Sequence, residues 1–266
     1  MTSNTYFRFY AELNEFLAGD FRHRPVCRTC PDEATVKHMI EAFGVPHTEV
    51  ELILINGESV DFSARVRDSD HVSVYPSFGL LDISPILKLP SRPLRGDRFV
   101  ADSHLGRLAK QLRMLGFDVL YHSSYEDQEI ARISVDEGRI VLSRDRNLLM
   151  HKAIVRGCCL HGESTDEQVL EVLARLDLSR SIRPFTRCLR CNGLLNDVDK
   201  DAVAYRVPER SRKFYQRFFE CADCKNIYWE GSTWLECVRA SGKLSKRRKK
   251  AGRHEACVSA MESSER

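Results

Sequence analysis

Apolar and polar residues alternate over short distances in the first 84 residues. Apolar runs predict strands at 6–10, 49–56 and 72–75 and a helix at 35–43. The dipeptide Asn56-Gly57 follows the second strand and is typical of a tight hairpin turn. This order predicts a small α+β domain at 1–84, with a loop between its first strand and its helix.

The residue pattern changes near residue 98, where short apolar segments alternate with segments of helical periodicity. Four segments predict strands, each followed by a helix: FVA at 99–101, FDVLY at 117–121, RIVLS at 139–143 and AIVRGCCL at 153–160. Strands that alternate with helices are typical of a parallel sheet covered on both faces. The sequence therefore predicts an α/β domain at 97–183.

Two of these helices carry specific signals. In the first, one leucine stripe is expected to face the core while Arg113 lies away from it. The stripe consists of Leu105, Leu108, Leu112 and Leu115. In the fourth, Thr165 and Gln168 fit a capping box ahead of an apolar stripe. Both helices are therefore expected to be well specified.

Proline and charge mark the remaining boundaries. Three prolines disfavour helix and central strand just after residue 84, so we expect a linker at 85–96. The alternation stops after Pro184, where a cysteine-rich segment at 184–238 begins. The tail at 239–266 includes KLSKRRKK, which has no apolar periodicity and is expected to be disordered when alone.

The composition favours a reducing compartment. An apolar share of 42% and a charged share of 30% are ordinary for globular proteins. The longest aliphatic run, at 52–55, is too short to cross a bilayer, and no signal peptide precedes it. The ten cysteines include CxxC pairs, which indicate metal or redox chemistry in the absence of an export signal. We therefore expect a cytoplasmic protein with no membrane partner.

The strongest local motif is a pair of cysteine knuckles, Cys188-x-x-Cys191 and Cys221-x-x-Cys224. Four thiolates suit a tetrahedral zinc ion, and a closed four-sulfur site is structural because no position is open to substrate. The 29 residues between the knuckles exceed the common spacing of about 15–20, but a hairpin can fill them. The alternative is unligated or redox-active thiols.

Three aspartates follow the predicted strands: Asp102, Asp127 and Asp145. Because the carboxyl ends of parallel strands form the site-bearing edge of an open sheet, these side chains can converge there. Carboxylates suit Mg²⁺ or Mn²⁺, which can activate water for attack on a phosphodiester. The alternative is structural: Asp127 caps a helix, and the other two are turn residues.

Several motifs occur in order along the second half of the chain. ADSHLGRLAKQLRMLGFDVLY is followed by DQEIARISVDEGRIVLSRDRNL, then by RCLRCN and CADCKNIYWEGSTW. Together they resemble the Mut-seven C-terminal ribonuclease family of the PIN-like superfamily over residues 97–235, more than half of the chain. The resemblance implies a PIN-like Rossmannoid domain, with a three-layer parallel-sheet architecture, a C-terminal zinc ribbon, and ribonuclease activity at an acidic metal site.

The resemblance also implies roles for single residues. Asp102, Asp127 and Asp145 match the acidic positions, the last within SRDR where the family typically has TRDR. Glu126 or Asp118 is an alternative to Asp127. Three arginines are candidates for phosphate contacts, since guanidinium groups suit phosphate oxygens, and their alternative is a surface ion pair. They are Arg113, Arg144 and Arg146.

The N-terminal domain carries a second resemblance. The run GVPHTEVELILINGESVDFSARVRDSDHVSVYP is similar to the ubiquitin-like β-grasp domain that precedes this ribonuclease module in many bacterial proteins, akin to the ThiS and MoaD sulfur carriers. Those carriers react through a free terminal Gly-Gly, whereas this chain has only Gly79 in PSFGLLD and continues. We therefore expect a binding or regulatory role, through a protein partner, instead of sulfur transfer.

The remaining signals each leave two interpretations open. Cys27-x-x-Cys30, with nearby histidines, forms either a second zinc site or free thiols, whereas Cys158 and Cys159 fit a buried strand. Aromatic residues around the second knuckle stack on unpaired bases or form the core of the ribbon. They are Phe214, Tyr215, Phe218, Phe219, Tyr228, Trp229 and Trp234.

The expected function is a Mg²⁺- or Mn²⁺-dependent ribonuclease acting on RNA, with single-stranded RNA favoured. In this reading the zinc ribbon supports RNA binding, and the basic tail is either a nonspecific nucleic-acid arm or a solvated terminus. Two other classes stay open: a noncatalytic RNA-binding protein and a protein-interaction adaptor. RNA affinity without cleavage distinguishes the first, and the absence of salt-sensitive RNA binding distinguishes the second.

Overall fold

The computed structural model describes residues 3–77, 88–89 and 96–231. Most of the expected linker at 85–96, Gly79 and the tail at 239–266 therefore lie outside the described residues. The chain forms two compact units, one made of residues 1–106 and 121–161 and the other of 107–120 and 162 onward. None of the helices in the described part is long and apolar enough to cross a membrane.

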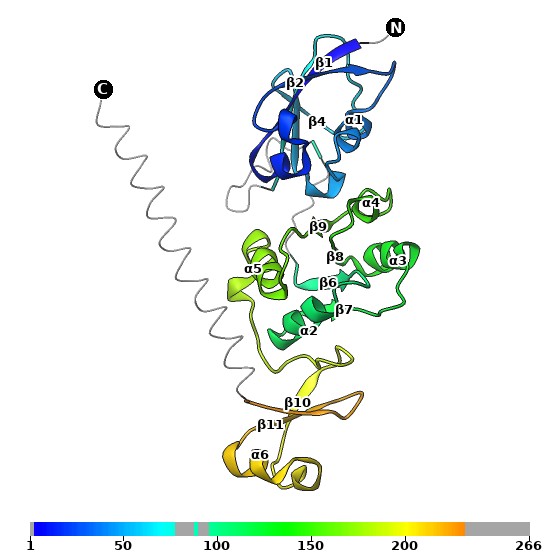
Figure 1. The fold of residues 1–266 in the computed structure, drawn as a ribbon. Helices are drawn as coiled ribbons and strands as arrows, with labels where there is room; N and C mark the ends of the chain where they lie inside the picture. Colours follow the sequence, from blue (N-terminus) through cyan, green and yellow to red (C-terminus); the bar gives the residue numbers. More distant parts are fainter. Residues whose placement is uncertain (1–2, 78–87, 90–95, 232–266) are drawn as a thin grey trace, which may run out of the picture. The chain divides into compact units, whose positions relative to one another are not determined.

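The first unit opens with a five-stranded mixed sheet in the order β2-β1-β5-β3-β4 (Figure 1). Strands β1 and β5 run parallel, and the other neighbours are antiparallel. The strands are β1 (Ser3–Phe9), β2 (Val26–Cys30), β3 (Leu52–Ile55), β4 (Glu58–Val60) and β5 (His71–Tyr75). Helix α1 (Val36–Ala42) contributes the buried Met39 and Ile40, and Phe7, Phe9 and Ile53 are buried in the sheet.

The predicted turn between β3 and β4 is confirmed. Asn56 and Gly57 have φ angles of 52° and 87°, the positive values that a tight hairpin turn with right-handed strand twist requires. The sequence did not predict strands β2 and β4. Strand β2 carries Cys27 on the exposed side and Cys30 on the buried side, because residues three apart on a strand point to opposite faces. Neither belongs to a metal-binding group among the described residues.

Three short 3-10 helices connect the elements of this sheet. They are η1 (Ala11–Phe16), η2 (Gly19–Phe21) and η3 (His47–Glu49). Residues of η3 are buried although they are polar, and η3 packs against β9 (Gly157–Cys159). The N-terminal sheet and β9 therefore belong to one packed unit, with η3 between the two in contact with β9.

The same unit contains the predicted parallel sheet. Strand β8 (Ile140–Ser143) pairs in parallel with β6 (Arg98–Ala101) on one side and with β9 on the other. Helix α3 (Asp127–Glu137) packs against β6 and β8, and α4 (Arg146–Leu149) packs against β8 and β9. Every residue of β8 is buried, which explains the apolar run that precedes Ser143 at its end.

Cys158 and Cys159 on β9 are both buried, as predicted for small apolar side chains on a core strand. These two cysteines therefore belong to the packed core around β9. The observed elements match the α/β alternation predicted from residue 98 onward.

The second unit begins with α2 (Gly106–Met114), whose last eight residues it contains, and β7 (Asp118–Leu120). The predicted leucine stripe is confirmed, because Leu108, Leu112 and Leu115 are buried. Arg113 was expected on the outer side of the helix, and this expectation was wrong, since its side chain is 4% exposed.

Helix α5 (Thr165–Arg175) has the capping box one residue earlier than predicted. Ser164 is the N-cap: its hydroxyl accepts from Glu167 N at 3.2 Å, and Glu167 Oε2 accepts from Ser164 N at 2.9 Å. Thr165 is already helical, and Gln168 instead donates to Gly162 O at 3.0 Å. The prediction that Thr165 and Gln168 form the box was therefore wrong, because two overlapping residue pairs fit the same sequence pattern.

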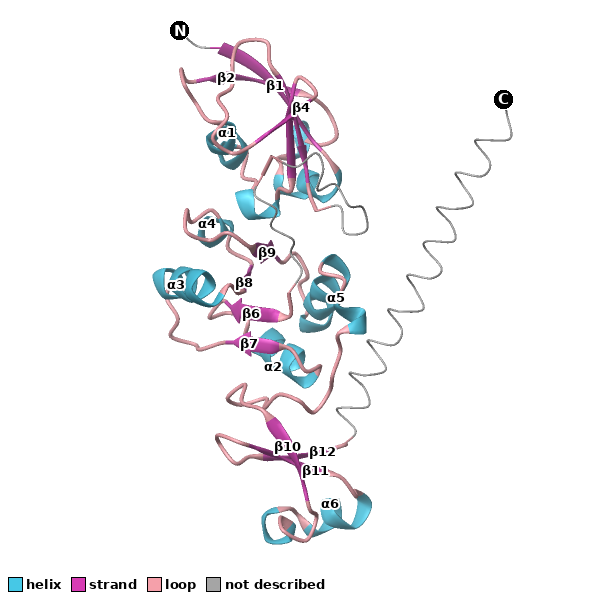
Figure 2. Ribbon diagram, turned by 180° about the vertical axis from the view of Figure 1, so that it is seen from behind, coloured by secondary structure: helices cyan, strands magenta, loops and turns pink. Residues whose placement is uncertain are grey.

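The cysteine-rich segment folds into a three-stranded antiparallel sheet in the order β10-β11-β12 (Figure 2). The strands are β10 (Leu195–Val198), β11 (Phe218–Cys221) and β12 (Ile227–Trp229). Short helices η5 (Leu178–Arg180), η6 (Ala204–Arg206) and α6 (Glu209–Phe214) lie before and between them in the chain. Val203, Val207 and Phe218 form the small core of this ribbon.

Candidate acidic site and zinc centre

The parallel pairing of β6 and β8 places two site residues side by side. Ala101 pairs with Leu142, and Asp102 N donates to Leu142 O at 3.0 Å. Asp102, directly after β6, and Ser143, the last residue of β8, therefore lie beside each other at the carboxyl ends of the two strands. This position is the carboxyl edge at which the sequence placed a candidate site.

The hydroxyl of Ser143 links two of the predicted aspartates. Ser143 Oγ donates to Asp102 Oδ2 at 2.7 Å and accepts from Asp145 N at 2.9 Å. Ser103 Oγ donates to the other carboxylate oxygen of Asp102 at 3.1 Å. Sequence reasoning missed Ser143 as a site residue. The available signal was the hydroxyl that SRDR shares with the TRDR typical of the family.

Asp102 is buried without a positively charged partner. Its side chain is 7% exposed and accepts hydrogen bonds only from neutral groups in the described structure. No Lys, Arg or His nitrogen among the residues described lies within 4.0 Å of the carboxylates of Asp102, Asp127 or Asp145. Because a buried charge is costly unless it is paired or binds a metal, this arrangement suits a cation.

Asp145 has both a structural role and an open position. It is the N-cap of α4, where its Oδ1 accepts from Asn147 N at 2.7 Å. Its side chain is otherwise exposed. The structural alternative for Asp145 was a turn residue, and capping a helix is a structural role that the sequence had instead suggested for Asp127. The cap uses one carboxylate oxygen of Asp145 and leaves the second available to a ligand.

The structure does not gather all three aspartates into one cluster. Asp127 is exposed in the first turn of α3, and Glu126 is the N-cap of this helix but makes no side-chain cap hydrogen bond. Within the part of the chain that the structure describes, four cysteines form the only group of three or more potential ligands with atoms mutually within 4.8 Å. Asp102 and Asp145 are linked by Ser143, whereas Asp127 stays a separate candidate.

Asp118, an alternative to Asp127, is committed elsewhere. Its carboxylate accepts from Asn192 Nδ2 at 2.7 Å and pairs with Arg187 Nη2 at 3.2 Å. Both partners belong to the first cysteine knuckle and its approach. Asp118 therefore anchors the knuckle next to β7.

The guanidinium of Arg113, a candidate for a phosphate contact, donates instead to backbone carbonyls within the protein. Its Nε and Nη2 donate to Val119 O at 2.9 and 2.8 Å, and its Nη1 donates to Leu189 O at 3.2 Å and Arg190 O at 3.1 Å. A nearly buried guanidinium with these partners is a structural clamp. Residues 76 and 77 positions away in the sequence supply two of its acceptors, so a local pattern could not identify them.

Arg146 is also held by the protein. Its Nη1 donates to Phe16 O at 2.9 Å, and its guanidinium carbon lies 5.0 Å from the centre of the Phe16 ring. These contacts hold the Arg146 side chain against Phe16, and its role in a phosphate contact stays a prediction. Arg144 is exposed and has no ion-pair partner among the described residues, so it stays a candidate for substrate binding.

The four knuckle cysteines form a cluster that can hold a metal such as zinc. Cys188 Sγ lies 3.5 Å from Cys224 Sγ, and Cys191 Sγ lies 3.4 Å from Cys221 Sγ. A tetrahedral zinc site with Zn–S bonds near 2.3 Å separates its sulfur atoms by about 3.8 Å. The donor set and its spacing therefore fit zinc.

The two knuckles share a backbone geometry. In each, the residue after the second cysteine has a left-handed conformation, with φ of 69° at Asn192 and 59° at Lys225. Asn192 N donates to Cys188 O at 2.9 Å, and Lys225 N donates to Cys221 O at 3.2 Å. These turns bring both cysteines of a CxxC pair to the same side.

The thiols differ in acidity. Burial by itself raises the pKa of Cys188, but the Tyr228 hydroxyl and two backbone N–H groups donate to its sulfur and lower its pKa to about 6. Burial raises the pKa of Cys191 to about 12 and also raises the pKa of Cys224. Thiolate is the form that binds zinc, so Cys191 and Cys224 must release protons when a metal binds.

Comparisons with known proteins match a family model to each of two parts of the chain. Residues 97–241 match the family model described as the Mut7-C RNAse domain, and residues 2–82 match the model described as Mut7-C ubiquitin. No curated protein and no solved structure matches the chain. The first match covers more than half of the chain and includes both the acidic edge and the cysteine cluster.

Proposed function

This chain belongs to the Mut7-C RNAse domain family, and on that premise we propose that it is a metal-dependent ribonuclease that hydrolyses RNA phosphodiester bonds at the edge formed by Asp102 and Asp145. The observation that carries the proposal is the link Asp102–Ser143–Asp145. It joins the buried carboxylate of Asp102 to the backbone N–H of Asp145, whose side chain is exposed, at the ends of two neighbouring strands. No cationic nitrogen of the described residues lies within 4.0 Å of either carboxylate.

Asp102 and Asp145 are the residues that would hold Mg²⁺ or Mn²⁺, with Asp127 as the third candidate. When bound, such an ion neutralises negative charge and lowers the pKa of a coordinated water. The chain's own groups orient the site: Ser143 fixes one carboxylate oxygen of Asp102, and the α4 cap fixes one oxygen of Asp145. Exposed Arg144 lies between Ser143 and Asp145 in sequence and would bind a phosphate oxygen of the RNA.

The other parts support this activity. The ribbon would bind one structural zinc ion through Cys188, Cys191, Cys221 and Cys224, and would contribute to binding of single-stranded RNA. The ubiquitin-like domain would recruit or regulate through a protein partner, and the whole would act in the cytoplasm. Sulfur-carrier chemistry is not part of the proposal.

A second candidate function is noncatalytic RNA binding. The observation that favours it is the position of Asp127, which does not join Asp102 and Asp145 in a group of three ligands in the described structure. The distinction between the two functions is the ability to cut RNA, since both predict salt-sensitive RNA affinity.

The test is cleavage of labelled single-stranded RNA with Mn²⁺ or Mg²⁺. We expect the wild type to cut and Asp102→Asn and Asp145→Asn to lose cleavage while keeping their zinc. Asp136→Asn is the matched control, because Asp136 is an exposed aspartate on α3 that pairs with Arg132. Equal RNA binding by all four proteins without cleavage, over a range of substrates and metals, would establish the noncatalytic function instead.

A further inference from the structure

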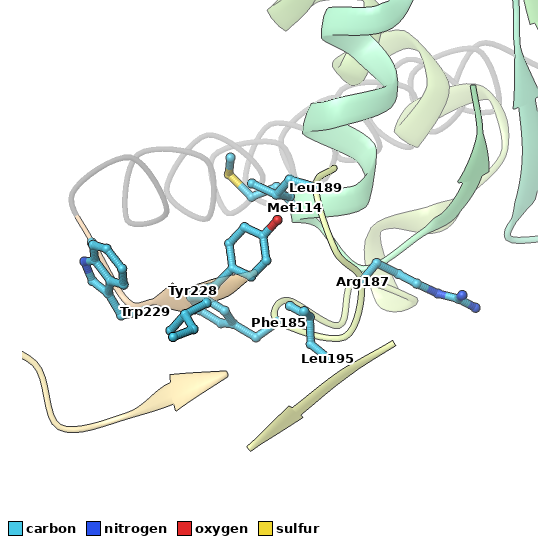
Figure 3. Close-up of a pocket in the computed structure, with 9 residues that line it drawn as sticks. Met114, Phe185, Arg187, Leu189, Leu195, Tyr228 and Trp229 are labelled. Atoms are coloured by element: carbon cyan, nitrogen blue, oxygen red, sulfur yellow. The ribbon is translucent and has the colours of Figure 1, made fainter. Parts of the chain in front are cut away.

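A pocket of about 330 Å³ lies beside the first cysteine knuckle (Figure 3). Its walls come from the end of α2, from the segment leading into the knuckle, and from β10 and β12. Six of the side chains that line it are apolar or aromatic: Met114, Phe185, Leu189, Leu195, Tyr228 and Trp229. This volume is at the lower end of the range that small-ligand sites occupy, about 300–1,000 Å³.

The pocket has apolar walls that stay partly open to solvent. All six of these side chains are only half-buried. The closed core of the ribbon is a different cluster, formed by Val203, Val207 and Phe218, although Trp229 also packs against it. A concave apolar surface that the core does not close is the kind of surface that binds a ligand.

Two of the aromatic walls are fixed in place. The Phe185 ring stacks on Phe219 with centroids 4.6 Å apart and an interplanar angle of 12°. The Tyr228 hydroxyl lies 3.1 Å from Cys188 Sγ, so its polar atom is engaged by the cysteine cluster and its ring serves as a wall. A preformed aromatic wall binds a flat ring with little loss of side-chain freedom.

Positive charge flanks the pocket in sequence. Arg190 follows the lining residue Leu189, and Lys225 precedes β12, and both side chains are exposed. Neither has an ion-pair partner in the parts of the chain that the structure describes. Arg187 contributes differently: in Figure 3 its guanidinium points away from the aromatic walls, toward its ion pair with Asp118.

We propose that this pocket binds one nucleobase of single-stranded RNA. The base stacks on the rings that line the pocket, and Arg190 and Lys225 neutralise the adjacent phosphates. This combination of an apolar aromatic wall with free cations fits a flat base attached to an anionic backbone. Because the walls offer few polar atoms, we expect binding with little preference for base identity. The inference rests on the proposed function, which supplies RNA as the substrate.

The first experiment uses the fluorescence of Trp229. The chain has two tryptophans, so Trp234→Phe leaves Trp229 as the only one. Asp145→Asn in the same protein prevents cleavage under the proposed function. We expect an oligouridylate to quench Trp229 emission on binding, and a strand of the same length with abasic spacers to bind without quenching it.

The second experiment fills the pocket. Leu195→Phe adds a ring inside it, and Leu194→Phe adds the same group at the neighbouring residue, which is 57% exposed and does not line the pocket. Loss of one stacked base corresponds to about 5–150-fold in Kd. We expect Leu195→Phe to weaken oligouridylate binding within this range with an unchanged salt dependence, and Leu194→Phe to bind like its parent. Bound zinc, measured in each variant, confirms an intact ribbon.

The outcomes separate the pocket from the ribonuclease proposal. Salt-dependent binding of the oligouridylate with no quenching of Trp229 and no effect of Leu195→Phe overturns the pocket assignment alone. If the parent carrying Asp145 neither binds nor cuts the oligouridylate, the proposed function fails and the pocket assignment falls with it. Equal quenching by the abasic strand also overturns the inference, since that strand has no base to stack.

Discussion

Glu49 Oε1 accepts a hydrogen bond from the backbone N–H of Cys159 at 2.5 Å, and both residues are buried. The bond joins η3 of the ubiquitin-like domain to β9 of the RNase-domain sheet, 110 residues later in the chain. His47 on the same 3-10 helix contacts Ile154 O through its Nε2 at 2.9 Å. These contacts make the N-terminal domain a packed part of the first unit.

Replacing Glu49 should therefore destabilise the protein. Glu49→Ala leaves the Cys159 N–H buried without its acceptor, a loss of about 1–3 kcal/mol in the free energy of unfolding. Equilibrium denaturation of the full chain measures it. Glu58→Ala, at an exposed position on β4, is the control and should cost less. Equal losses in the two variants would show that the Cys159 contact does not stabilise the fold.

Ser143→Ala should impair cleavage without unfolding the domain. The change removes the hydroxyl that orients Asp102 and accepts from Asp145 N. Loss of such a supporting group typically lowers metal affinity or activity about 10–100-fold. Cleavage rate measured against Mn²⁺ concentration should show this loss, while Ser143→Thr keeps a hydroxyl and should retain most of the activity. Unchanged metal dependence in the alanine variant would contradict the role.

Arg113→Met should loosen the first cysteine knuckle. The methionine cannot donate to the carbonyls of Leu189 and Arg190, nor to the buried carbonyl of Val119, and one unsatisfied buried carbonyl costs about 1–3 kcal/mol. We expect faster zinc loss to a chelator and a lower unfolding midpoint. Lys110→Met, at an exposed position on the same helix, is the matched control. A variant that loses RNA affinity but keeps its stability and zinc would restore the phosphate role for Arg113.

The capping box of α5 should lower the pKa of Glu167. Hydrogen bonds from the backbone and hydroxyl of Ser164 lower the pKa of Glu167 below its usual value of 4.5. A group with a lowered folded pKa stabilises the protein above the unfolded value, and this contribution disappears as the pH falls through the folded pKa. The contribution should therefore be complete above about pH 4.5 and lost below it.

Carboxyl chemical shifts measured against pH test this prediction. Ser164→Ala should return the pKa of Glu167 toward 4.5, because the hydroxyl contribution is removed. Thr165→Ala is the control, since Thr165 is not the N-cap. An unchanged pKa of Glu167 in Ser164→Ala would contradict the hydrogen bonds of this capping box.

The sequence by itself determined the elements with strong local signals. The β3–β4 turn needs two residues that tolerate positive φ, and Asn56-Gly57 supplies them. The leucine stripe of α2 and the strand β8 follow from periodicity and from an uninterrupted apolar run. The two CxxC pairs predicted a four-cysteine cluster, and the structure brings the four sulfur atoms within 4.8 Å of one another. The sequence did not predict strands β2 and β4, because they are short and partly exposed and their apolar pattern is weak.

Only the tertiary structure decided which charged groups are free. Arg113 and Arg146 look like surface arginines in sequence, yet each donates to a distant carbonyl, 76 positions away for Arg113 and 130 for Arg146. Ser143 also belongs to the candidate site through a distant contact, since its hydroxyl donates to Asp102, 41 positions earlier in the chain. Hydrogen bonds of this kind depend on where distant segments meet, and local periodicity carries no information about that meeting.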